Sequence, residues 1–138
     1  MPYSLSFRER QDYDPGEDGI TVSVILSTGY KQVRLLAKVD TGASNCIFQR
    51  EYGEELGLDL EAGTPKRFGT VVDSFLAYGH DLTLSALGYD LAVTAYFASV
   101  LSFPRNVLGR HGWLQLMRLG LVDYDGKLYA SRYDKEAP

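Results

Sequence analysis

The chain has 138 residues, the size of one ordinary domain, and its 45% hydrophobic and 23% charged content excludes wholesale disorder and a fibrous architecture. The net charge of −4 argues against a nucleic-acid partner, because phosphate binding needs a clustered basic surface. One cysteine and two histidines cannot form a disulfide or a Cys/His zinc cluster, so we expect no metal and no other cofactor.

Location is predicted from what the sequence lacks. No apolar run approaches the roughly 20 residues that cross a membrane, so we expect no membrane partner. The N-terminal segment has neither a basic start nor an apolar stretch typical of a secretory signal. We therefore expect a cytoplasmic protein.

Apolar residues at every second position predict two strands in the first third of the chain. The first covers 20–26 and the second 33–39, with a turn at Ser27-Thr28-Gly29 between them. The second strand delivers Asp40 to its end. The spacing of Phe48, Tyr52 and Leu56 then predicts a short helix over about 49–56, with Gly57 where a helix C-cap would lie.

Strand patterns return after this helix. Residues 66–87 predict a hairpin with its tip near Gly69 to Asp73, and a further strand enters through Gly88. A second helix is expected from Arg110 to about Arg118, and Asp125-Gly126 predicts a hairpin turn. Seven or eight short strands and two short helices favour an all-β domain spanning 1–138, closed or sandwiched, with its core at about 20–131.

The tripeptide Asp40-Thr41-Gly42 is a weak motif by itself, since it occurs by chance in on the order of one chain in ten to twenty of this size. A plain alternative is an Asx-type turn after a strand. Three features strengthen the motif: the amphipathic strand before it, the segment "FPRNVLGRHGWL" at 103–114, and the hairpin between the two.

In this order the motifs "VDTGAS" and "NVLGR" resemble the two signatures of the retropepsin family, the single-lobe aspartic proteases, over residues 20–131. The form "VDTGASNCIF" looks closer to bacterial and retrotransposon members than to retroviral ones. The resemblance implies a small closed acid-protease barrel. It also implies a helix and a final strand after the second motif.

The resemblance also implies roles for individual residues. Asp40 would be the catalytic acid, Thr41 would brace the site, and Gly42 would let a substrate backbone come close. Further roles fall to other residues: Ala43 and Ser44 would contact substrate, Gly69, Thr70, Val71, Val72 and Asp73 would form a mobile flap, and Val107, Leu108, Gly109 and Arg110 would support the Asp40 loop. The plainer interpretations are an ordinary hairpin for the flap and a solvated surface arginine for Arg110.

An aspartic protease needs two carboxylates about 3 Å apart that share one proton, one acting as base toward water. The chain contains no second Asp-[Ser/Thr]-Gly. A C₂ homodimer would supply the partner as Asp40 of a second copy, because an isologous interface brings a residue near the axis against itself. We therefore expect a homodimer that cleaves peptide or unfolded protein substrates.

Other chemistry is less well supported by the sequence. Cys46 lies in a strand pattern and is expected to be a small buried hydrophobe, and no role is assigned to His111. Two rival hypotheses remain. One is a catalytically silent module of the same fold that dimerises or binds peptides, and the other is a different small β-barrel in which Asp40 is a turn residue.

Overall fold

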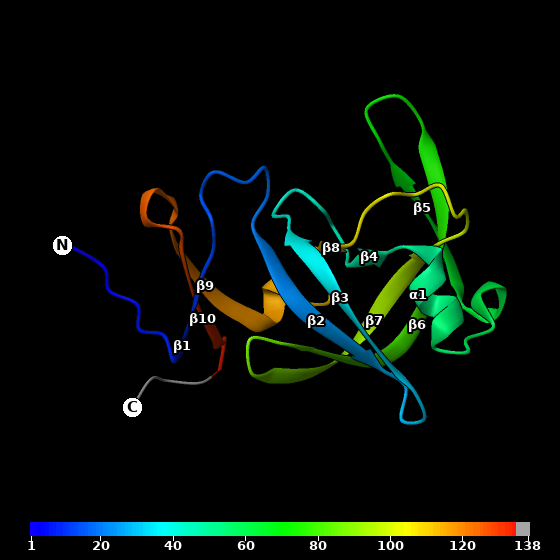
Figure 1. The fold of residues 1–138 in the computed structure, drawn as a ribbon, viewed down its shortest axis with the longest axis horizontal. Helices are drawn as coiled ribbons and strands as arrows, with labels where there is room; N and C mark the ends of the chain where they lie inside the picture. The colour runs from blue at the N-terminus through cyan, green and yellow to red at the C-terminus, as the bar shows by residue number, and fades with distance from the viewer. Residues whose placement is uncertain (135–138) are drawn as a thin grey trace.

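The computed structural model describes residues 1–134 and is built mainly of β-strands, which confirms the all-β class (Figure 1). No helix among these residues is long and apolar enough to cross a membrane. The elements in chain order are β1 (Glu9–Asp12), β2 (Thr21–Ser27), β3 (Gln32–Val39), β4 (Ile47–Phe48), α1 (Arg50–Glu55), η1 (Leu60–Ala62), β5 (Thr64–Gly69), β6 (Ser74–Ala86), β7 (Tyr89–Ala98), β8 (Val107–Leu108), η2 (Leu114–Leu116), β9 (Met117–Val122), η3 (Asp123–Asp125) and β10 (Lys127–Arg132).

Seven strands form one sheet in the order β2-β3-β8-β4-β7-β6-β5. Strand β2 also pairs with β6, from Val24 opposite Ala86 to Ser27 opposite Thr83, and this pairing brings the sheet into a nearly closed ring. Strand β5 continues the sheet beyond the ring. Closure leaves β2 and β6 with neighbours on both sides, which removes the exposed edges that an open sheet would have there.

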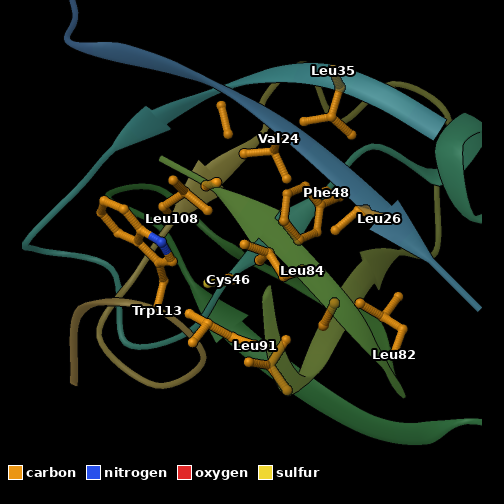
Figure 2. Packing of buried hydrophobic residues seen from close by; sticks show 14 of the residues in the cluster. Val24, Leu26, Leu35, Cys46, Phe48, Leu82, Leu84, Leu91, Leu108 and Trp113 are labelled. Atoms are coloured by element: carbon orange, nitrogen blue, oxygen red, sulfur yellow. The ribbon is translucent and has the colours of Figure 1, made fainter. Parts of the chain in front are cut away.

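The core fills the inside of this ring. Strands β2 and β3 each bury every second residue, as their alternation predicts; the buried residues are Val22, Val24, Leu26, Val33, Leu35 and Ala37. Figure 2 shows Phe48 and Leu84 among these side chains and Trp113 beside Leu108 at one end. Each fully buried aliphatic side chain contributes roughly 1.5–3 kcal/mol to the hydrophobic stabilisation.

Most local predictions agree with the structure. Helix α1 lies within the predicted 49–56, and Gly57 follows it with φ +75°, the left-handed conformation of a helix C-cap. The predicted hairpin forms between β5 and β6, where Gly69 pairs with Ser74. Gly126, at φ +62°, forms the predicted turn before β10.

The helix predicted from Arg110 to about Arg118 is wrong. Only the single turn η2 forms there, and β9 begins at Met117. Gly112 has φ +107° and Trp113 has φ −150°, neither of which is helical. Trp113 and Met117 are both buried, so their spacing of four imitates a helix stripe although the backbone between them changes direction.

A second sheet, in the order β1-β10-β9, was not predicted. The described residues contain ten strands where seven or eight were expected, and β1 extends the ordered domain before residue 20. Strand β1 pairs with β10 from Glu9 opposite Ala130 to Asp12 opposite Lys127, and Asp12 forms ion pairs with Arg10 at 3.2 Å and Lys127 at 3.0 Å.

Candidate active site

Asp40 is held in a tight turn at the end of β3. Its backbone N–H donates to the Leu108 carbonyl at 3.0 Å, and its carbonyl accepts from the Ala43 N–H at 3.2 Å. One carboxylate oxygen, Oδ1, accepts from the Gly42 N–H at 2.9 Å. The side chain is thus fixed by its own loop while the residue stays only half-buried. This is an oriented carboxylate that a second molecule could reach.

The second motif lies directly against this loop. Strand β8 pairs in parallel with β3, with Val39 opposite Leu108, and antiparallel with β4, with Ile47 opposite Val107. Val107 and Leu108 are both buried. Two segments more than 60 residues apart in the sequence are thereby brought together, and β8 separates the strand that enters the Asp40 loop from the strand that leaves it.

Gly109 allows the loop to approach β8 closely. A Cβ atom at Gly109 would lie 2.1 Å from the carbonyl oxygen of Asn45 and 2.8 Å from that of Ala43, so no side chain fits. The next two residues clamp the loop: the Arg110 N–H donates to the Ala43 carbonyl at 2.9 Å and the His111 N–H to the Ser44 carbonyl at 2.8 Å. Two backbone hydrogen bonds therefore hold the loop on the side that faces the second motif.

The remaining residues of the loop and the clamp lie nearer solvent. Thr41 and Gly42 are exposed, Ala43 is half-buried, and the Ser44 hydroxyl donates to Asn45 Oδ1 at 3.0 Å. The Arg110 side chain is exposed and forms no ion pair with any residue that the structure describes. His111 Nδ1 lies 3.1 Å from Gln115 Oε1. Within residues 1–134, no group of three or more possible ligands could hold a metal ion.

The candidate flap is a hairpin with a fixed turn and an exposed apolar tip. The Thr70 N–H donates to the Asp73 carbonyl at 2.6 Å, and the Asp73 N–H donates to the Thr70 hydroxyl at 3.0 Å. Between them Val71 is 104% exposed and Val72 is 92% exposed. In Figure 1 this tip extends beyond the rest of the sheet, on the side where β3 leads into the Asp40 loop.

Aromatic residues, most of which sequence reasoning did not single out, anchor the base of this hairpin. Phe68 of β5 stacks on Phe75 of β6 at 5.7 Å between ring centroids, and Phe75 contacts Phe103 at 4.7 Å. Ala43 packs against the same hydrophobic cluster. The hairpin base is thus joined to the Asp40 loop by apolar contacts, while Val71 and Val72 at its tip are exposed.

A polar contact also joins the hairpin to the loop. Lys66 of β5 donates from Nζ to Asn45 Oδ1 at 3.0 Å, and this same oxygen accepts from the Ser44 hydroxyl. Asn45 is only 7% exposed. The spacing of the sequence gives no signal for this pair, because Lys66 and Asn45 come together only through the register of β5 in the sheet.

Cys46 is not a nucleophile. Its side chain is fully buried, and burial raises the pKa of the thiol to about 12, despite the hydrogen bond from the Gly109 backbone that acts in the opposite direction. The prediction that Cys46 is a buried hydrophobe is therefore confirmed. Among the candidate groups of the loop, the Asp40 carboxylate remains the one suited to acid–base chemistry.

Neither the protein-family models nor the curated proteins give a match to this chain. The site is accordingly defined by its own geometry: an oriented half-buried carboxylate, a glycine-dependent clamp behind it, and an apolar-tipped hairpin beside it.

Proposed function

We propose that the chain is an aspartic endopeptidase of the retropepsin-like type that works as a C₂ homodimer, with Asp40 of each copy facing the other on the axis. The observation that carries the proposal is the packing of the Asp40 loop across β8 and Gly109. That packing brings together the two motifs on which the resemblance rests. The carboxylate is half-buried at the end of a strand and accepts from the Gly42 N–H, and a symmetric partner could meet it there.

The chemistry requires the dimer. Two facing carboxylates cannot both ionise, so the pair holds one proton; the charged member removes a proton from a water molecule and the protonated member polarises the scissile carbonyl. The single chain offers one such loop. A two-fold axis beside the exposed Thr41-Gly42 turn would duplicate it without any further sequence.

The surrounding residues would bind the substrate. Gly42 lacks a side chain and is exposed, so an extended peptide could approach the backbone of this loop. The exposed Val71 and Val72 would close over that peptide and exclude water, gaining apolar burial that they lack in the free chain. The segment after Gly109 differs from the expected pattern, since the single turn η2 and the start of β9 lie where a helix was expected.

Cleavage of an unstructured, apolar-rich protein such as unfolded casein at mildly acidic pH tests the proposal. We expect products in gel and mass-spectrometric assays, inhibition by a statine-type analogue, and complete loss of cleavage in Asp40→Asn with an unchanged far-UV spectrum. Asp18→Asn, a change at an exposed acid outside the site, is the matched control and should cleave normally. Full activity in Asp40→Asn would refute the mechanism.

A further inference from the structure

Lys66 is a cation that contacts two residues lining a pocket near the proposed active site. Its ammonium group donates to Asn45 Oδ1 at 3.0 Å and lies 5.3 Å and 5.8 Å from the ring centroids of Phe68 and Tyr96. These contacts restrict a side chain that is usually mobile. Among the described residues, no carboxylate forms an ion pair with Lys66.

The pocket beside this cation has a volume of about 360 Å³, and two of the residues that line it, Asn45 and Tyr96, are the ones that Lys66 contacts. That volume is within the range of small-ligand sites. His111 and Gln115 add polar groups to the wall. A cation, an amide and two polar side chains are donors of the kind that bind a carboxylate.

The charges around the pocket favour the binding of an anionic group at one end of it. Thr94, which lines the pocket, donates its hydroxyl to the carboxylate of Asp81 at 2.7 Å, so an acid lies next to that part of the wall. At Asn45, another residue of the lining, the side-chain oxygen accepts from the Lys66 ammonium group. An anionic side chain would be repelled from the Asp81 end and attracted to Lys66, which has donors left after its single bond to Asn45.

We propose that Lys66 and Asn45 bind the side-chain carboxylate of a peptide, so that the protein selects substrates with a glutamate or aspartate at one fixed position. This inference rests on the proposed function, because it takes the ligand of the Asp40 site to be a peptide. The hydrogen bond from Lys66 to Asn45 places the acidic subsite beside the loop that carries Asp40. Lys66 is then a specificity-determining residue with no part in the bond cleavage itself.

Binding of matched peptides to Asp40→Asn protein tests the inference without turnover. A library of fluorescent, apolar-rich peptides, each paired as a glutamate and a glutamine version, is titrated by anisotropy. We expect at least one position where glutamate binds about tenfold more tightly than glutamine, the low end for a charge-assisted hydrogen bond. Lys66→Gln in the same background should reduce that ratio to about one and leave glutamine-peptide binding unchanged.

Lys31→Gln is the matched control, since Lys31 lies exposed in the β2–β3 turn and should keep the tenfold preference. The preference should also shrink as salt is raised. Peptides that bind with no preference for glutamate at any position, or a preference that survives Lys66→Gln, would overturn the inference. Failure of the wild-type chain to cleave would refute the proposed activity instead, because acidic preference in binding would still identify the subsite.

Discussion

The carbonyl oxygen of Asn45 occupies the space that a side chain at Gly109 would need, 2.1 Å from the position of a Cβ atom. Next to this contact, the backbone N–H groups of Arg110 and His111 donate to the carbonyl oxygens of Ala43 and Ser44 and join the Asp40 loop to the segment that follows β8. The position of the Asp40 loop therefore depends on a glycine at residue 109, because the loop can pack this closely only where residue 109 has no Cβ atom.

Gly109→Ala should consequently damage both stability and the site. The added Cβ atom would overlap the backbone carbonyl oxygens of Asn45 and Ala43, which cannot rotate away as a side chain can. We therefore expect a loss of about 3 kcal/mol in the free energy of unfolding. Thermal unfolding measures this as a fall in Tm of about 10 °C. Gly69→Ala is the control, since nothing lies within 4 Å of a Cβ atom there. Equal Tm values for the two variants would contradict the clamp.

Mixing an excess of Asp40→Asn protein with wild-type protein should inhibit peptide cleavage by the wild-type chains. If each active unit needs an Asp40 carboxylate from both copies, hybrid dimers have one acid and cannot share a proton. At about a ninefold excess of the variant, most wild-type chains are in hybrids, and activity per wild-type chain should fall by roughly tenfold after exchange. The assay is peptide cleavage after overnight mixing. The same excess of Asp18→Asn should leave activity undiminished, and a lack of inhibition by Asp40→Asn would mean that each chain works alone.

Changing Val71 and Val72 together to threonine should lower kcat/KM while leaving Tm almost unchanged. Both side chains are exposed in the single chain, so the isosteric hydroxyl costs little and Tm should change by less than about 2 °C. If the hairpin closes over a peptide, kcat/KM should fall by about tenfold, because buried apolar contacts in the complex are lost. Unchanged kcat/KM would show that the tip does not touch the substrate.

Local patterns in the sequence carried the prediction of β2, β3, the β5–β6 hairpin and the Asp40 turn, because alternation and turn residues act within a few positions. The structure of the segment after Gly109 was predicted incorrectly. Trp113 and Met117 have helical spacing, yet Gly112 turns the chain and pairing with β10 fixes the outcome. Strand β1 was not predicted for another reason: its residues are polar, and it pairs with a segment more than 100 residues away.

The contacts of the candidate site also fall into those that short motifs predict and those that depend on strand pairing. Asp40 and Gly109 were predictable because each lies in a short motif whose residue types have a physical reason. The aromatic contact of Phe75 with Phe103 and the bond from Lys66 to Asn45 depend on how separate strands are aligned. A shift of one residue in β5 would move Lys66 to the opposite face of the sheet, so no spacing in the sequence alone could reveal that contact.

Cys46 should make the protein less stable at alkaline pH. Burial raises the thiol pKa from 9.0 to about 12 in the folded chain, whereas the unfolded chain keeps the ordinary value. Between these two values the unfolded state holds fewer protons, so the free energy of unfolding falls as pH rises, by up to about 1.4 kcal/mol per pH unit, with the stabilising contribution intact below pH 9. Urea unfolding from pH 8 to 11 measures it.

The comparison that isolates this thiol is Cys46→Ala, which removes the titrating group and leaves the tyrosines and lysines unchanged. The variant should start less stable, because a small cavity forms in the core, yet its stability should decline less steeply above pH 9. Native wild-type protein should also react with a thiol reagent only as fast as it unfolds, since the thiol is fully buried. Parallel pH profiles for the two proteins, or rapid labelling at pH 8, would mean that Cys46 reaches solvent in the folded chain.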